Sequence, residues 1–173
     1  MVKLTPIFKG QKNKAAARAA FAGDFETAFS WIGKGAEINS SAYIGDPDED
    51  GGEGNIGYAA IKHGNLQALE KALDMGLDPS FQSPYRSPLV IFAIQNKQED
   101  AAKLLIARGA DVSSYLLGDF FSPLATARVY NMPDVEALIA QKLTPDQLAT
   151  ARANDLPQIG GAPKNSKPNG LKL

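Results

Sequence analysis

The chain has 173 residues, of which 44% are hydrophobic and 21% charged, a balance typical of one globular domain with a continuous core. A net charge of −1 argues against a nucleic-acid-binding protein, and the lack of cysteine excludes disulfides, thiolate metal sites and thiol catalysis. No stretch approaches the ~20 apolar residues of a membrane span and residues 1–9 lack the apolar run of a signal peptide, so we expect a cytoplasmic protein, or a periplasmic one if a leader has been removed.

Four segments share one pattern, in which a helix rich in small residues ends at a turn and a more amphipathic helix follows. The turns between the two helices fall at Gly23, Gly64, Lys97 and Asn131. They are separated by 41, 33 and 34 residues, and in the first three segments a second glycine follows after 12 residues. These second glycines are Gly35, Gly76 and Gly109. The spacing predicts a structural repeat, and the second glycines are expected where the chain leaves a helix in a left-handed turn.

The pattern resembles the ankyrin repeat, a unit of about 33 residues that begins Thr-Pro-Leu-His-x-Ala. The closest matches are the segments 109–112 (Gly-Ala-Asp-Val) and 122–124 (Ser-Pro-Leu), and the resemblance covers residues 14–143. It implies an all-α ankyrin-repeat solenoid of helix-turn-helix units with β-hairpin-like fingers, as in a bacterial protein of about four repeats. No segment has the histidine of the start motif, and the fourth has Leu143 in place of the closing glycine.

The resemblance divides the chain into an N-terminal extension, four repeats, a capping helix and a tail. The expected ranges are 1–13 for the extension, then 14–54, 55–86, 87–121 and 122–143 for the repeats, 144–156 for the capping helix and 157–173 for a disordered tail. Ser87 and Ser122 are expected to cap first helices, each followed by a proline suited to the first turn. Thr144 and Gln147 have the spacing of a capping box, which predicts a short helix to about Asn154.

An acidic insert over 41–55 lengthens the first repeat by about eight residues. Its acidic side chains are Asp46, Asp48, Glu49, Asp50 and Glu53. Three of them, Asp46, Asp48 and Asp50, have the spacing of the first half of a calcium loop, but Gly57 stands where a bidentate glutamate is needed. A solvated loop, a contact with a basic surface of a partner, and a calcium site remain open as interpretations.

The finger over 115–121 is apolar where ankyrin fingers are usually polar. Its sequence is Tyr-Leu-Leu-Gly-Asp-Phe-Phe. Some of these side chains can pack as core under the neighbouring finger, and the others can serve as exposed anchors for a partner. Both interpretations remain open.

No set of acid, base and nucleophile is apparent, so we expect no enzyme and no cofactor. His63 stands alone and is interpreted as a structural or surface-contact residue, and neither a Gly-x-Ser-x-Gly elbow nor a phosphate-binding glycine loop occurs. The resemblance instead implies a partner-binding face made of the fingers and the first helices. The residues expected there are Tyr43, Asp46, Asp48, Glu49, Asp50, Glu53, Tyr58, Lys62, His63, Phe81, Tyr85, Arg86, Gln95, Asn96, Tyr115, Phe120 and Tyr130.

We therefore expect a monomeric protein-protein interaction module that binds neither nucleic acid nor membrane. By analogy with some bacterial ankyrin proteins, it is an immunity or inhibitory protein that neutralises a cognate toxin or effector enzyme. The alternative is a calcium- or ligand-responsive regulatory scaffold that uses the acidic insert.

Overall fold

The computed structural model describes residues 9–43, 53–84, 86–113 and 122–155. These ranges contain nine helices and one two-stranded sheet, so the fold is mostly helical, in agreement with the predicted all-α class. None of the helices in the described ranges is long and apolar enough to cross a bilayer.

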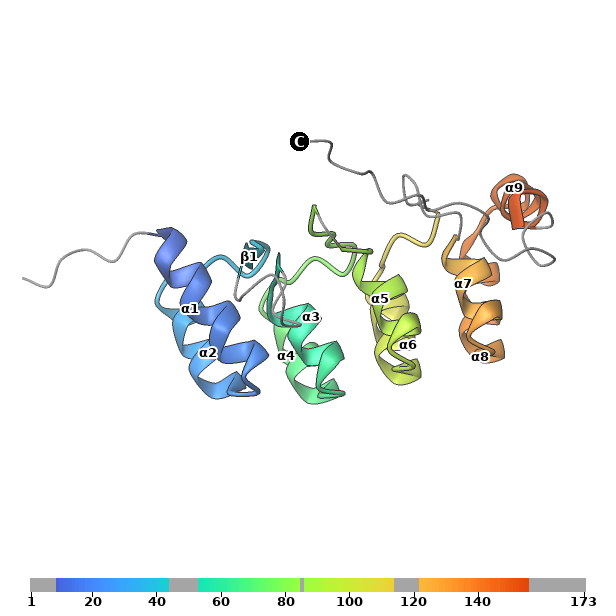
Figure 1. Cartoon of the computed structure of the whole chain (residues 1–173). Coiled ribbons are helices and arrows are strands. Elements are labelled where there is room, and N and C mark those ends of the chain that lie inside the picture. The colour runs from blue at the N-terminus through green and yellow to red at the C-terminus, as the bar shows by residue number, and fades with distance from the viewer. Residues whose placement is uncertain (1–8, 44–52, 85, 114–121, 156–173) are drawn as a thin grey trace, which may run out of the picture.

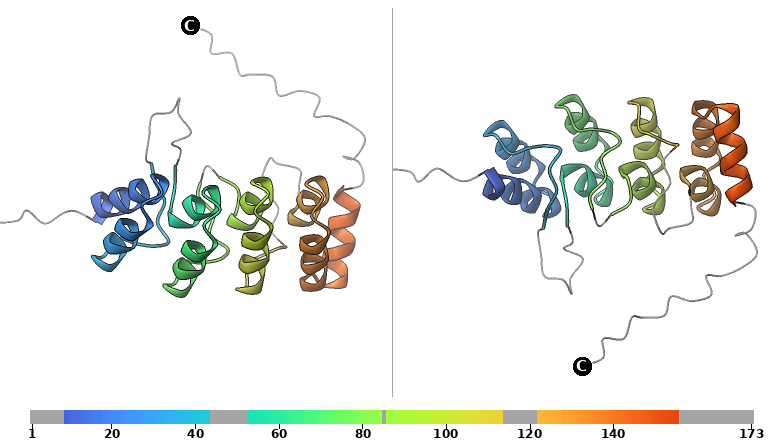
Figure 2. Two further views of the ribbon diagram at one scale, coloured as in Figure 1. Left: turned by 90° about the horizontal axis from the view of Figure 1, so that it is seen from below. Right: turned by 90° about the horizontal axis from the view of Figure 1, so that it is seen from above.

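Eight of the helices form four pairs, which we call units one to four. The pairs are α1 (Lys9–Phe21) with α2 (Phe25–Gly33), α3 (Ile56–Lys62) with α4 (Leu66–Asp74), α5 (Leu89–Gln95) with α6 (Glu99–Ala107), and α7 (Pro123–Val129) with α8 (Pro133–Lys142). The units stand side by side in one row, and α9 (Pro145–Asp155) packs against α7 at the end of that row (Figure 1). The first helices form one layer and the second helices the other (Figure 2).

Two short strands lie between units one and two. Strand β1 (Ala42–Tyr43) pairs antiparallel with β2 (Glu53–Gly54), and Ala42 lies opposite Gly54. Strand β1 also contacts α1, whereas β2 leads through Asn55 into α3. The two ends of the acidic insert are therefore held together beside the first helices.

The turn between the two helices has the same backbone geometry in all four units. The turn residues have positive φ angles: Gly23 84°, Gly64 62°, Lys97 57° and Asn131 55°. In unit two, Gly64 N donates to Ile61 O (3.0 Å) and Asn65 N to Ala60 O (2.9 Å), which satisfies two carbonyl groups at the end of α3. The same two bonds recur in the other units at 2.9–3.0 Å. The turn positions predicted from the spacing are confirmed.

The second glycines also have the predicted left-handed conformation, with φ angles of 95° at Gly35, 96° at Gly76 and 92° at Gly109. Unit four differs because Leu143 is extended, with φ −81° and ψ 142°. A branched side chain disfavours the left-handed region. The chain therefore passes directly from α8 into α9 instead of turning toward another finger.

Helix α9 begins at the predicted capping box. Thr144 N donates to Gln147 Oε1 (2.9 Å), and Gln147 N donates to Thr144 Oγ1 (3.3 Å). The helix ends at Asp155, one residue beyond the prediction, and buries Ala151 against the core.

One of the two predicted serine caps is wrong, and the first helix is longer than expected. Ser122 Oγ accepts from Ala125 N (3.1 Å) and caps α7, but the N-cap of α5 is Pro88, and Ser87 Oγ donates instead to Gln95 Oε1 (3.4 Å). Ser87 lies one residue too early relative to its turn, so its hydroxyl cannot reach the first helical N–H groups. Helix α1 begins at residue 9, inside the range 1–13 predicted as an extension.

Side chains also hold the connection that leaves each second helix, from within unit one for the first connection and from the preceding unit for the next two. Two residues after each closing glycine, the backbone N–H donates to a side chain that lies earlier in the chain. The bonds are Glu37 N to Asn13 Oδ1 (2.8 Å), Asp78 N to Asn39 Oδ1 (2.7 Å) and Asp111 N to Ser80 Oγ (2.9 Å). The equivalent residue of unit four is Pro145, which has no N–H, so the series ends there.

Changing Gly109 to alanine tests the backbone constraint at the closing glycines. A Cβ at Gly109 would meet nothing within 4 Å, so the cost comes from its positive φ alone. We expect Gly109→Ala to lower the free energy of unfolding by about 1 kcal/mol, measured by urea denaturation. Gly33→Ala is the matched control, because that site is equally open and lacks a positive φ; it should leave stability unchanged or raise it. Equal effects of the two changes would contradict the assignment.

Asn39 provides one of the links between units one and two. Its Oδ1 accepts from Asp78 N, and its Nδ2 donates to Gly76 O (2.8 Å), so Asn39→Ala removes two bonds between units. We expect a loss of about 1 kcal/mol in the free energy of unfolding, with faster amide exchange in α1 and α2 than in α6. Asn96→Ala, which removes only a bond to Phe92 O within α5, should cost less. The link is unimportant if both variants are equally stable.

Candidate functional site

A single face of the first helices carries the exposed side chains of the candidate site. Residues nine, five and two positions before each turn residue share this face, because spacings of four and three keep side chains on one side of a helix. We call these residues the first-helix stripe: Lys14, Arg18 and Phe21 in unit one, Asn55, Ala59 and Lys62 in unit two, Pro88, Phe92 and Gln95 in unit three, and Ser122, Thr126 and Val129 in unit four. The exposed members are Lys14, Arg18, Lys62, Gln95 and Val129.

The predicted partner-binding residues divide into four groups. Those on the surface are Tyr43, Lys62, His63, Gln95, Asn96 and Tyr130. Those that are half-buried are Glu53, Phe81 and Arg86, and Tyr58 is fully buried. Those outside the described residues are Asp46, Asp48, Glu49, Asp50, Tyr85, Tyr115 and Phe120.

Tyr58 belongs to the core, so its prediction as a partner-binding residue is wrong. Its side chain is 0% exposed, and its hydroxyl donates to Ser87 O (2.7 Å) and accepts from Ser83 N (3.1 Å). Its ring meets Phe81 and Phe92 edge-on, with centroids 6.2 and 5.1 Å away. Burial raises the pKa of the phenol above its usual value, so the donating O–H form is retained.

Arg86 was expected on the partner-binding face, and its guanidinium is engaged within the chain instead. The group lies over the rings of Phe21 (5.9 Å), Tyr58 (5.6 Å) and Phe92 (5.5 Å), and its Nε donates to Glu53 O. These rings come from α1, α3 and α5. Arg86 therefore ties the segment between α4 and α5 to β2 and to three successive units.

Phe92 is the residue of this cluster that was not predicted. It occupies the stripe position five residues before a turn, and this periodicity was the signal that could have found it. Phe21 also packs on β2, because a Cβ at Gly54 would lie 2.8 Å from the Phe21 ring.

His63 joins the first two units at the edge formed by the turns. Its Nε2 lies 3.0 Å from Phe21 O, and its ring meets Phe25 edge-on with centroids 5.9 Å apart. A carbonyl oxygen only accepts, so Nε2 carries the proton. The contact agrees with the structural interpretation of this histidine, and its side chain is also exposed.

The base of the acidic insert is held by a side-chain hydrogen bond beside the strand pair. Ser41 Oγ donates to Glu53 Oε1, so this carboxylate already has a partner. The proposed calcium ligands Asp46, Asp48 and Asp50 lie outside the described residues, and the described part of the chain contains no group of three residues that could hold a metal ion.

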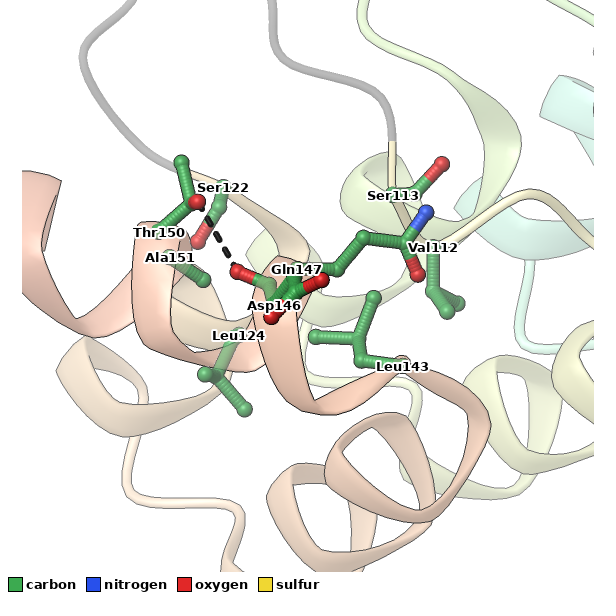
Figure 3. Close-up of a pocket in the computed structure, with 9 residues that line it drawn as sticks. All are labelled: Val112, Ser113, Ser122, Leu124, Leu143, Asp146, Gln147, Thr150 and Ala151. Atoms are coloured by element: carbon green, nitrogen blue, oxygen red, sulfur yellow. Dashed lines mark hydrogen bonds between the residues drawn. The ribbon is translucent and has the colours of Figure 1, made fainter.

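A cavity of about 190 Å³ lies between α7, α9 and the end of unit three (Figure 3). Its apolar lining includes Val112, Leu124 and Leu143, and Thr150 Oγ1 donates to Asp146 O (2.8 Å) at its polar side. Ligand sites usually have about 300–1,000 Å³. Asp146 is the one ionisable residue in the described lining, so this lining provides no pair of acid and base.

No protein-family model matches the chain, and no curated protein matches it in sequence. The repeated turn geometry and the exposed side chains of the first helices are therefore the observations from which a function can be inferred. Neither depends on residues outside the described ranges.

Tyr58→Phe tests how much the buried hydroxyl contributes to the free energy of unfolding. The change leaves Ser83 N buried without its acceptor, so we expect the free energy of unfolding to fall by about 1–3 kcal/mol in chemical denaturation. Tyr130→Phe is the matched control, because the Tyr130 side chain is 36% exposed and its hydroxyl can bond to water. A destabilisation by Tyr58→Phe no larger than that of the control would show that Tyr58 acts through its ring alone.

Proposed function

We propose that the chain is an ankyrin-type repeat solenoid that binds another protein through its first helices and fingers. Three repeated features support the repeat assignment: the turn with two backbone bonds in four units, the left-handed glycine in three, and the side-chain links between connections. The resemblance of segments 109–112 and 122–124 to the ankyrin pattern points the same way.

The main evidence for a binding role is that one core position is the same in every unit, whereas the positions just before the turn differ. Four residues before the turn, every unit has alanine: Ala19, Ala60, Ala93 and Ala127. The last three of these are at most 1% exposed, and Ala19 packs against the same core. One and two residues before the turn, the side chains differ in every unit: Phe21-Ala22, Lys62-His63, Gln95-Asn96 and Val129-Tyr130. Solenoids use such an extended surface to recognise partners.

The partner we propose is a toxin or effector enzyme, which this chain neutralises as an immunity or inhibitory protein. The acidic insert supports this choice, because β1 and β2 place its two ends beside α1 and α3. Its sequence carries five carboxylates between 46 and 53, which suit the basic mouth of an active site that acts on an anionic substrate.

Co-purification with the product of the adjacent gene tests this function. The tagged full chain should form a stable complex with that protein and inhibit its activity. Replacing Gln95 and Tyr130 together by alanine should weaken the complex at least ~10-fold, because exposed side chains of the stripe and its neighbours contribute directly to binding. The matched control replaces Gln67 and Gln141, which are exposed on α4 and α8 in the other layer.

Two results would contradict the proposal: no complex and no inhibition, or a complex that only the control variant weakens. Repeating the experiment with calcium and with a chelator addresses the regulatory alternative. A complex that forms only with calcium would favour that alternative, in which Asp46, Asp48 and Asp50 bind the ion.

A further inference from the structure

The two helix layers carry opposite charge. Helices α1, α3, α5 and α7 contain no aspartate or glutamate, and their basic residues are Lys9, Lys12, Lys14, Arg18, Lys62 and Arg128. The second helices α2, α4, α6 and α8 carry mostly acidic residues: Glu26, Glu70, Asp74, Glu99, Asp100, Asp134 and Glu136, against Lys71, Lys103 and Lys142. The net charge of −1 is the sum of these separated contributions and the loops.

Some of the cations in the first layer are engaged in the fold. Lys9 pairs with Glu37, Lys12 Nζ donates to Lys34 O (2.8 Å), and Arg128 pairs with Glu136 (2.6 Å). Lys14 and Arg18, four residues apart on α1, are exposed and make no ion pair with any described residue.

The basic part of the stripe continues into unit two. Lys62 of α3 is exposed in the same stripe as Arg18. Arg86 adds a fixed cation beside them, because its guanidinium lies over Phe21 of α1. Helices α1 and α3 therefore carry several positive charges and no carboxylate, and on the adjoining strand β2 the carboxylate of Glu53 accepts from Ser41 Oγ.

The stripe becomes neutral and then apolar toward α7. In unit three its exposed residue is Gln95, followed by Asn96. In unit four it is Val129, which is 62% exposed, followed by Tyr130 at 36%. An exposed valine next to a tyrosine at the end of the stripe is the type of contact that anchors a protein partner.

We propose that the first-helix stripe docks an acidic segment of the protein partner. In this arrangement the carboxylates of that segment lie over Arg18 and Lys62, and an apolar side chain packs against Val129. The inference rests on the proposed function and adds the chemistry of the partner and the direction in which it lies. A protein fits better than a nucleic acid, because a phosphate backbone needs cations along its whole path, and neither Gln95 nor Val129 supplies one.

A peptide selection on the immobilised full chain tests this inference without a known partner. A random peptide library displayed on phage should yield peptides rich in aspartate and glutamate that end in a large apolar residue. The double variant Arg18→Glu and Lys62→Glu should bind these peptides at least ~10-fold more weakly, because both of its changes reverse the local charge. Val129→Asp should remove the preference for the apolar residue.

The matched control carries the same change in charge on the other layer, with Lys71→Glu and Lys142→Glu. It should select and bind the same peptides as the unchanged chain. Circular dichroism and thermal unfolding of every variant show whether helix content and stability are retained. Only variants that pass this check are compared.

The possible outcomes separate this inference from the proposed function. Enrichment of basic or neutral peptides, or acidic peptides that bind the double variant unchanged, would overturn the charge assignment and leave the binding role intact. No enrichment above the bare support would count against both. A random single-stranded oligonucleotide that binds more tightly than the selected peptides, measured by fluorescence anisotropy, would assign the stripe to nucleic acid instead.

Discussion

The left-handed turn between the helices of each unit is the constraint on which the structure depends. Two backbone hydrogen bonds close every first helix at this point, and the geometry is the same whether the residue is Gly64 or Lys97. Since the turn sets the rotation and the starting residue of both helices, it also determines which side chains face the neighbouring unit. Lys97 and Asn131 accept a conformation that glycine adopts more easily, which indicates that packing of the units outweighs this local cost.

The alanine that lies four residues before each turn shows that the position of the turn determines which side chains pack in the core. A small side chain at this position is packed in the core, and a large buried side chain follows it in two of the units, Ile61 and Ile94. Tyr58 and Arg86 then fasten the connections to this frame, because the hydroxyl of one and the guanidinium of the other reach across successive units. The surface is therefore free to differ from unit to unit without changing the frame.

The sequence allowed a good prediction of features set by local backbone chemistry. The spacing located all four turns, glycine indicated three closing turns, and Thr144 with Gln147 indicated the start of α9. Prediction from the sequence failed where the environment of a side chain depends on a neighbouring unit. Tyr58 and Arg86 have side chains typical of exposed anchors, and they are buried or engaged only because α5 and the segment before it approach them. The helix cap predicted at Ser87 was wrong because this serine lies one residue too early relative to its turn.

The same dependence on register explains why the overall composition gave no hint of the partner's charge. A net charge near zero is an average over both layers, and it argues only against a strongly basic protein. Once the turns assign each residue to a layer, all the carboxylates of the four paired units' helices fall on the second helices. A long-range field depends on this distribution and not on the sum. The first-helix stripe can therefore attract an acidic partner although the chain as a whole is slightly acidic.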